Sequence, residues 1–155
     1  MKHFAFKAAA IAAAMFLFSF MASAQAALIT DNENMQCTVL RLVSPEGEVN
    51  LICHLEWRGD SPITDFIFDT ADSKIVDNQG SVYSGDAVLI HYALSTDNTT
   101  IDYIGPKSKV LVTIKVKGVG SDATAFTSIE LPYKCSSDSG TLTGKFSRSN
   151  DLRFK

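Results

Sequence analysis

Hydrophobic and polar residues alternate along most of the chain after residue 34, which is the pattern of strands with one buried and one solvated face. The clearest example lies at residues 110–116, where every second residue is apolar: Val110, Val112, Ile114 and Val116. The same period of two recurs at residues 49–57, 66–68, 88–94 and 129–135. No segment of this part shows an amphipathic helical repeat. We therefore predict about seven to nine short strands.

Turn-forming residues separate these strands at regular intervals. They lie at residues 45–48, 58–62, 77–80, 95–100, 118–122 and 136–140. This spacing predicts an all-β, antiparallel, immunoglobulin-like sandwich, with a small closed barrel as the alternative. Residues 37–43 and 49–57 should form its first hairpin. Pro132 cannot donate a ladder hydrogen bond, so its strand should lie at a sheet edge or be bulged there.

The first 24 residues have the pattern of a secretory signal peptide. A lysine-containing start precedes an apolar run at residues 8–21, and two small-x-small cleavage sites follow, at residues 22–24 and 24–26. A retained membrane anchor is the alternative, but about 20 apolar residues are needed to span a bilayer. We expect cleavage after Ala24 or Ala26 and a periplasmic or secreted location.

The remaining chain has the length of one domain, residues 25–155, with a loose lead up to about residue 34. The whole chain carries a net charge of -3, and removal of Lys2 and Lys7 leaves 12 basic residues against 17 acidic ones. Because an acidic domain repels phosphates, nucleic acid is not expected as a partner. An anionic membrane surface is not expected as a partner for the same reason, and we expect no membrane insertion after signal cleavage.

Three cysteines, Cys37, Cys53 and Cys135, follow the signal segment. An odd number in an oxidising compartment allows at most one intramolecular disulfide. In the first hairpin Cys53 falls opposite Val39 or Leu40, which leaves Cys37 two or three residues out of register. Cys53 and Cys135 both face inward on strands that a sandwich can place in opposite sheets. We therefore favour Cys53–Cys135, then Cys37–Cys53, then Cys37–Cys135. Cys37 is then the spare thiol and, where exposed, a route to a dimer.

Arg58, Gly59 and Asp60 form the triplet that integrins recognise, and they lie in a predicted loop between strands. In integrin ligands the two charged side chains are presented on either side of the glycine. Gly and Asp are also the residues that commonly end a strand in a turn. We interpret the triplet as a turn, with an adhesion loop as the alternative.

No set of side chains forms a recognisable catalytic or metal-binding motif. Five aspartates lie close together in the sequence, but their spacing fits no calcium loop and predicts a solvated acidic rim: Asp65, Asp69, Asp72, Asp77 and Asp86. His54 and His91 occupy outward positions of apolar strands and have no accompanying nucleophile motif. We expect no catalytic residue, no metal and no cofactor.

Several of these segments together resemble a known class of domain. Trp57, the Gly59-Asp60 turn, Phe66 and Phe68 precede an Asp-x-x-Gly-x-x-Tyr signature at residues 77–83. A strand introduced by Gly105-Pro106 and a final Ile-x-Leu strand at residues 129–131 follow. This order resembles the bacterial extracytoplasmic immunoglobulin-like sandwich domains of unknown function. The resemblance implies the sandwich and the location, but no reaction.

The leading functional hypothesis is an exported, non-enzymatic module that binds a protein or a glycan in the cell envelope or outside the cell. It rests on a full set of strands and turns without converging catalytic residues. One alternative is an envelope hydrolase or metal-dependent enzyme with an unrecognised site. The other is a structural or assembly protein that lends an exposed sheet edge to a partner.

Overall fold

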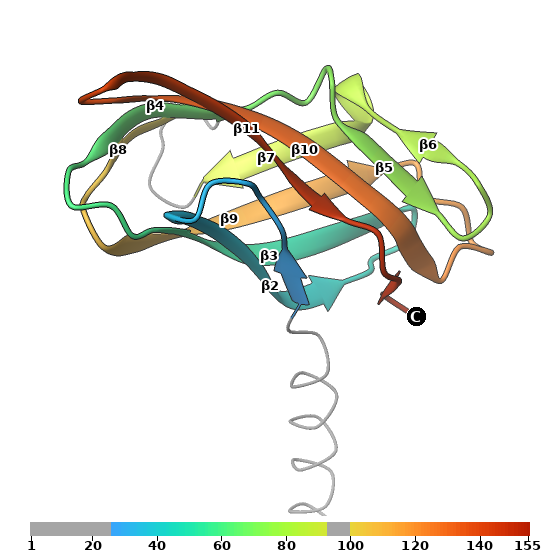
Figure 1. The fold of residues 1–155 in the computed structure, drawn as a ribbon. Helices are drawn as coiled ribbons and strands as arrows, with labels where there is room; N and C mark the ends of the chain where they lie inside the picture. The colour runs from blue at the N-terminus through green and yellow to red at the C-terminus, as the bar shows by residue number, and fades with distance from the viewer. Residues whose placement is uncertain (1–25, 93–99) are drawn as a thin grey trace, which may run out of the picture.

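The computed structural model describes residues 26–92 and 100–155, which form two antiparallel β-sheets packed face to face (Figure 1). The expected signal peptide, Leu94 and most of the loop at residues 95–100 lie outside these residues. Nine strands of the described part have four residues or more, and three are shorter. One 3₁₀ turn, η1 (Gly85–Ala87), accompanies them, and no described helix is long and apolar enough to cross a membrane. The predicted all-β antiparallel sandwich is confirmed.

The first sheet has the strand order β1-β2-β3-β9-β7. Its strands are β1 (Ala26–Leu28), β2 (Met35–Val43), β3 (Glu48–Trp57), β9 (Ser108–Lys117) and β7 (Val88–Tyr92). β2 and β3 form the predicted hairpin, in which Val39 pairs with Cys53. Residues 26–28 do not form the expected loose lead; they pair with β2 because Leu28 is buried opposite Cys37.

The second sheet is built around β10 (Ala125–Ser137), its longest strand. β4 (Ile63–Phe68) and β5 (Lys74–Asp77) lie end to end along one edge of β10. β11 (Gly140–Arg148) and β12 (Leu152–Arg153) lie along its other edge. β8 (Ile101–Ile104) pairs with β4, and β6 (Val82–Tyr83) pairs with β5.

Pro132 lies in this central strand, and the register shifts of β10 fall at residues 126–128 and 134–136, so the expected edge or bulge position is wrong. Its carbonyl accepts a hydrogen bond from the Asp69 amide at 2.8 Å. The proline nitrogen, which carries no hydrogen, faces the same edge of β10. On that edge Pro132 falls between Glu130, which pairs with β5, and Tyr133, which pairs with β4. A central strand tolerates the proline because no ladder donor is required at the junction of two partners.

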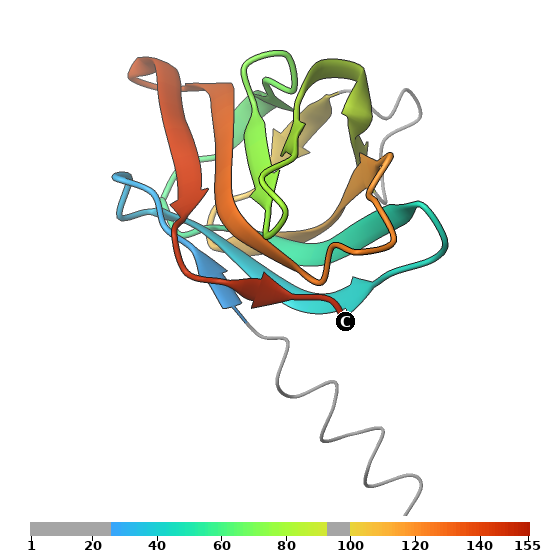
Figure 2. The same cartoon turned by 90° about the vertical axis from the view of Figure 1, so that its right-hand side faces the viewer.

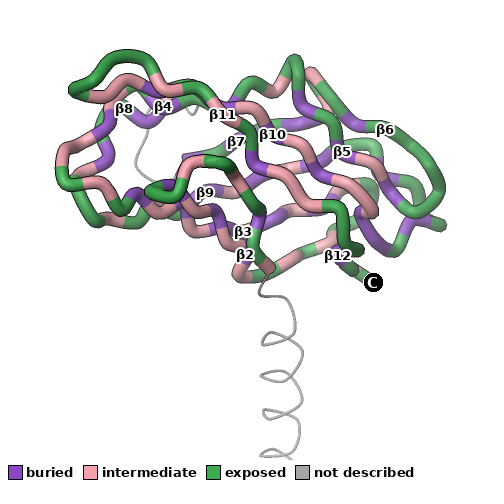
Figure 3. Tube along the Cα trace, in the orientation of Figure 1, coloured by how far each residue is buried: buried purple, intermediate pink, exposed green. Residues whose placement is uncertain are grey.

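The core lies between the sheets and follows the period of two in the sequence. Buried positions alternate with intermediate or exposed ones along the strands in Figure 3, and Val112, Ile114 and Val116 of β9 are fully buried. Phe66 and Phe68 of β4 face the same core, where Phe66 stacks on Tyr133 at 5.5 Å between ring centroids. The predicted inward faces of β3, β9 and β10 are confirmed.

Within the described residues one isolated backbone bridge joins the edges of the two sheets. Ile29, directly after β1, exchanges two backbone hydrogen bonds of 2.7 Å with Ser147 of β11. Figure 2 shows β1 in blue beside the red C-terminal strands on this side of the molecule. The bridge covers a single residue pair. Within the described residues the fold is therefore a sandwich whose sheets are bridged along one side, and not a continuous barrel.

Candidate functional site

The Asp-x-x-Gly-x-x-Tyr signature forms an exposed turn between β5 and β6 that is hydrogen-bonded to the buried side chain of Asp77. One carboxylate oxygen of Asp77 accepts hydrogen bonds from the Gln79 amide at 2.8 Å and the Ser81 amide at 3.0 Å. The other accepts the Tyr83 hydroxyl at 2.6 Å. Gly80 completes the turn with a positive φ of 86°. The motif therefore fixes a turn, and its role is structural.

Asp77 corrects one prediction. Asp77 is only 2% exposed, so its carboxylate is not part of the solvated acidic rim that the sequence predicts. Burial is tolerated because three donors satisfy the carboxylate. The same environment raises the pKa of Tyr83, first by burial and then through its hydrogen bond to Asp77.

A groove of about 420 Å³ opens where three loops meet at one end of the sandwich. The loops are those between β1 and β2, between β3 and β4, and between β10 and β11. Most of its lining side chains carry hydrogen-bonding groups: Asn32, Asn34, Asp60, Ser61, Ser137, Asp138 and Ser139. Trp57, Gly59, Pro62 and Leu142 add apolar surface. We call this feature the loop groove.

Trp57 holds the loop between β3 and β4 in place. Its indole Nε1 donates a hydrogen bond to the Ser61 carbonyl at 2.7 Å. Gly59 packs on the same ring, and a Cβ atom there would lie 2.5 Å from Trp57 Cε2. The glycine of the Arg-Gly-Asp triplet is thus required by its contact with the indole, independently of any receptor.

The two charged residues of the triplet are engaged with neighbours. The Arg58 guanidinium lies 3.3 Å from Glu56 and donates to Gln36, the residue that pairs with Glu56 across β2 and β3. Asp60 forms an ion pair of 3.4 Å with Lys107, and its side chain is 92% exposed. An ion pair this exposed contributes little to stability. Asp60 is therefore available in the loop groove, and the interpretation of the triplet as a turn without adhesion stays a prediction.

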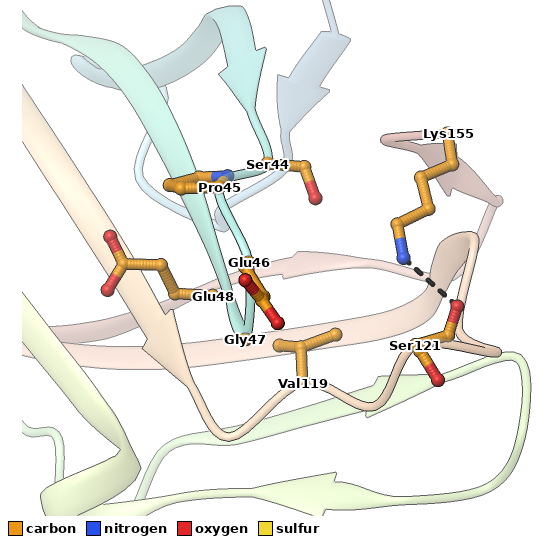
Figure 4. Close-up of a pocket in the computed structure, with 8 residues that line it drawn as sticks. All are labelled: Ser44, Pro45, Glu46, Gly47, Glu48, Val119, Ser121 and Lys155. Atoms are coloured by element: carbon orange, nitrogen blue, oxygen red, sulfur yellow. Dashed lines mark hydrogen bonds between the residues drawn. The ribbon is translucent and has the colours of Figure 1, made fainter.

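A second concave surface lies at the opposite end of the β2–β3 hairpin (Figure 4). It measures about 310 Å³ and lies between the turn at residues 44–48, Val119, Ser121 and Lys155. The Gly47 carbonyl accepts hydrogen bonds from the amides of Gly118 and Val119, and Lys155 donates to the Ser121 carbonyl at 3.1 Å. These contacts hold the β2–β3 turn against the loop between β9 and β10, so we regard this surface as structural.

The remaining candidates do not converge. His54 lies on β3 and His91 on β7, and each points away from the core, as predicted. Within residues 26–92 and 100–155 no group of three or more His, Cys, Asp or Glu side chains is placed to hold a metal ion.

The three cysteines are all buried free thiols, so the structure does not contain the predicted Cys53–Cys135 bridge. Cys37 and Cys53 lie in the first sheet, and Cys135 lies in the second. Dimerisation through Cys37 requires an exposed thiol, whereas Cys37 is 0% exposed. Burial raises the pKa of Cys135 to about 11, which makes this thiol a weak nucleophile.

The sequence pattern does not reveal half of the loop groove. It places Asn32 and Asn34 in a loose lead and residues 137–139 in a plain turn. The signal that could have found them is the concentration of Asn, Ser, Gly and Asp in three separate loops. That signal has meaning only once the fold brings the loops to one end.

No family model and no curated protein sequence matches the chain. Its fold is similar to that of the GAE domain of GGA2p from Saccharomyces cerevisiae, with a TM-score of 0.53 and 8% identity over 81% of this chain and 96% of that one. The yeast GGA1 GAE domain gives a TM-score of 0.50 and 8% identity over 79% and 96%. An uncharacterised β-sandwich protein from Clostridium difficile gives a TM-score of 0.41 and 13% identity over 76% and 87%. At these identities the two GAE domains support the sandwich fold alone.

Proposed function

We propose that this chain is an exported, non-enzymatic β-sandwich module that binds a protein or a glycan in the cell envelope or outside the cell, and that the loop groove is its binding site. The observation that carries the proposal is the composition of the groove. Hydroxyl, amide and carboxylate side chains from three loops surround a tryptophan and a glycine. Antibody loops, which also extend from one end of a sandwich, combine the same residue types because they give adaptable hydrogen bonding around a rigid aromatic anchor.

The charges and geometry of the loop groove support binding. Its acidic side chains, Asp60 and Asp138, accept hydrogen bonds from hydroxyl or amide groups of a ligand. Trp57, held by Ser61 and Gly59, gives the groove a rigid wall. Ligand groups can therefore be fixed without reordering that wall, which lowers the entropic cost of binding.

The test is binding of the purified chain to a printed glycan array and to a displayed random peptide library. We expect one of the two to yield a ligand whose affinity falls at least about tenfold in Asp60→Ala or Asp138→Ala, a loss of about 1.4 kcal/mol. Glu46→Ala, at the opposite end of the hairpin, is the matched control and should bind normally. A ligand that binds all three variants with the affinity of the wild type would show that the loop groove is not the binding site.

The two groove carboxylates favour one alternative, hydrolysis of a bound glycan, because glycosidases use a pair of acids. The same experiment separates the two functions. If the array sugar is cleaved, and Asp138→Asn abolishes cleavage while binding persists, the chain is a hydrolase. A bound sugar recovered intact supports the binding module.

A further inference from the structure

Cys37 and Cys53 are diagonal neighbours on one face of the first sheet. Val39 pairs with Cys53, and Cys37 pairs with Leu55, so the two cysteines are offset by two residues across β2 and β3. Both are 0% exposed and face the core. Diagonal Cα atoms in an antiparallel pair lie about 7–8 Å apart, with the Cβ atoms closer. This is just beyond the Cα spacing that a disulfide spans.

The Cys37 side chain is the largest of the causes that raise the pKa of Cys53, ahead of burial, while the Cys53 thiol itself donates a hydrogen bond to the Leu51 carbonyl at 3.6 Å. For Cys135, which lies in the opposite sheet, burial alone raises the pKa. The thiol beside Cys53 is therefore that of Cys37, on the adjacent strand of the same hairpin.

We propose that Cys37 and Cys53 form the single intramolecular disulfide of this protein, that it closes during folding, and that Cys135 remains a thiol. Both partners already share the inward face of adjacent strands and are one diagonal step apart. The pairing replaces Cys53–Cys135. It requires a thiol oxidant, and it does not depend on the loop groove.

The chemistry is thiol–disulfide exchange with a small disulfide such as oxidised glutathione. The thiolate of one cysteine attacks the glutathione disulfide, which gives a mixed disulfide and releases one reduced glutathione. The second cysteine then attacks the mixed disulfide and releases the other. The protein loses two hydrogen atoms, and both appear on the glutathione thiols.

Burial fixes the order of events. In the folded chain neither thiol is exposed, and the raised pKa of Cys53 disfavours the reactive thiolate. Exchange must therefore happen while β9 and the second sheet are still away from the hairpin. We expect the unfolded chain to oxidise readily in glutathione buffer and the folded, reduced chain to resist the same buffer.

Peptide mapping of the full chain tests both parts. The chain is refolded from denaturant in glutathione buffer, alkylated and digested with trypsin without reduction. Arg41 separates Cys37 from Cys53, so their bridge links two peptides. We expect this linked pair and an alkylated Cys135. Intact mass should fall by two hydrogen atoms in the wild type and in Cys135→Ser, and stay unchanged in Cys37→Ser.

Three results would overturn the proposal. They are a linked peptide that contains Cys135, three alkylated cysteines after refolding, and a folded reduced chain that oxidises as fast as the unfolded one. The mapping uses the wild-type chain in a defined buffer. Its result therefore does not depend on whether the protein is exported or binds a ligand.

Discussion

At the residue scale Asp77 is a buried carboxylate whose two oxygens are both held by hydrogen bonds. It accepts two backbone amides and the Tyr83 hydroxyl while almost fully buried. A buried carboxylate without such donors would be strongly destabilising. Each residue of the signature thus has a defined structural role, since Asp77 accepts hydrogen bonds, Gly80 turns the chain and Tyr83 donates.

We predict that Tyr83 makes the stability of the fold decrease at alkaline pH. Burial and Asp77 raise its pKa above 10.0, so the folded state favours the protonated phenol. The stability from this preference is fully present below pH 10 and is lost as the pH rises through the raised pKa. In urea melts from neutral pH to about pH 11, we expect Tyr83→Phe to lose less stability than the wild type. Tyr103→Phe, at a residue 60% exposed, is the control. Parallel losses in Tyr83→Phe and wild type would show that Tyr83 does not carry this dependence.

Ile114 and Thr113 test the assignment of faces on β9. Ile114 is 0% exposed, whereas Thr113 is half-buried on the other face. We expect Ile114→Ala to lower the free energy of unfolding by about 2–5 kcal/mol, through lost burial and a residual cavity. Thr113→Ala should cost much less. Urea melts measure both, and similar losses would mean that β9 is packed on both faces.

At the element scale β10 organises the second sheet. It pairs with four strands, and Pro132 falls at the junction of two of them. The neighbouring β11 adapts to β10 through Gly144, which pairs with Tyr133. A Cβ atom on Gly144 would lie 2.6 Å from the Cζ atom of that tyrosine ring. The glycine therefore allows the ring to lie over the strand and stack with the core aromatics.

Gly144→Ala should consequently displace either the Tyr133 ring or β11. We expect a loss of about 1–3 kcal/mol in the free energy of unfolding, as for other overpacked sites. Gly120→Ala is the matched control, because nothing lies within 4 Å of a Cβ atom there. It should be neutral or stabilise by up to about 1 kcal/mol. Thermal melts of both variants measure these effects. A Gly144→Ala variant as stable as the wild type would show that the Tyr133 ring can move aside at little energetic cost.

At the scale of the whole molecule, the strands place different loops at the two ends of the sandwich. One end carries the loop groove, and the other carries the structural surface around Val119 and Lys155. This separation allows the groove to vary in sequence without disturbing the turn at residues 44–48. It is also the reason that Glu46→Ala serves as a control for ligand binding.

Export belongs to the same scale and stays a prediction. We expect the exported protein to have an intact mass that corresponds to cleavage after Ala24 or Ala26. Because β1 begins at Ala26, the first site leaves the strand whole, whereas the second removes its first residue, which pairs with Val39. A mature protein that retains residues 1–22 would contradict the signal peptide.

The sequence alone determined the class of fold, the faces of the strands and the first hairpin. These features follow from a local period of two and from turn residues, which act over a few neighbouring positions. It also located the Asp77 signature, although it assigned the carboxylate to the surface. Burial of a charge depends on donors that only the closed turn brings together.

The tertiary structure decided everything that depends on distant segments meeting. It placed Pro132 in the central strand, because β4 and β5 end on either side of it. It brought the loops that carry Asn32, Asp60 and Asp138 to one groove. Alternation specifies which way a side chain faces, but the partner across a sheet or a core is set by strand order and register, which no local pattern encodes.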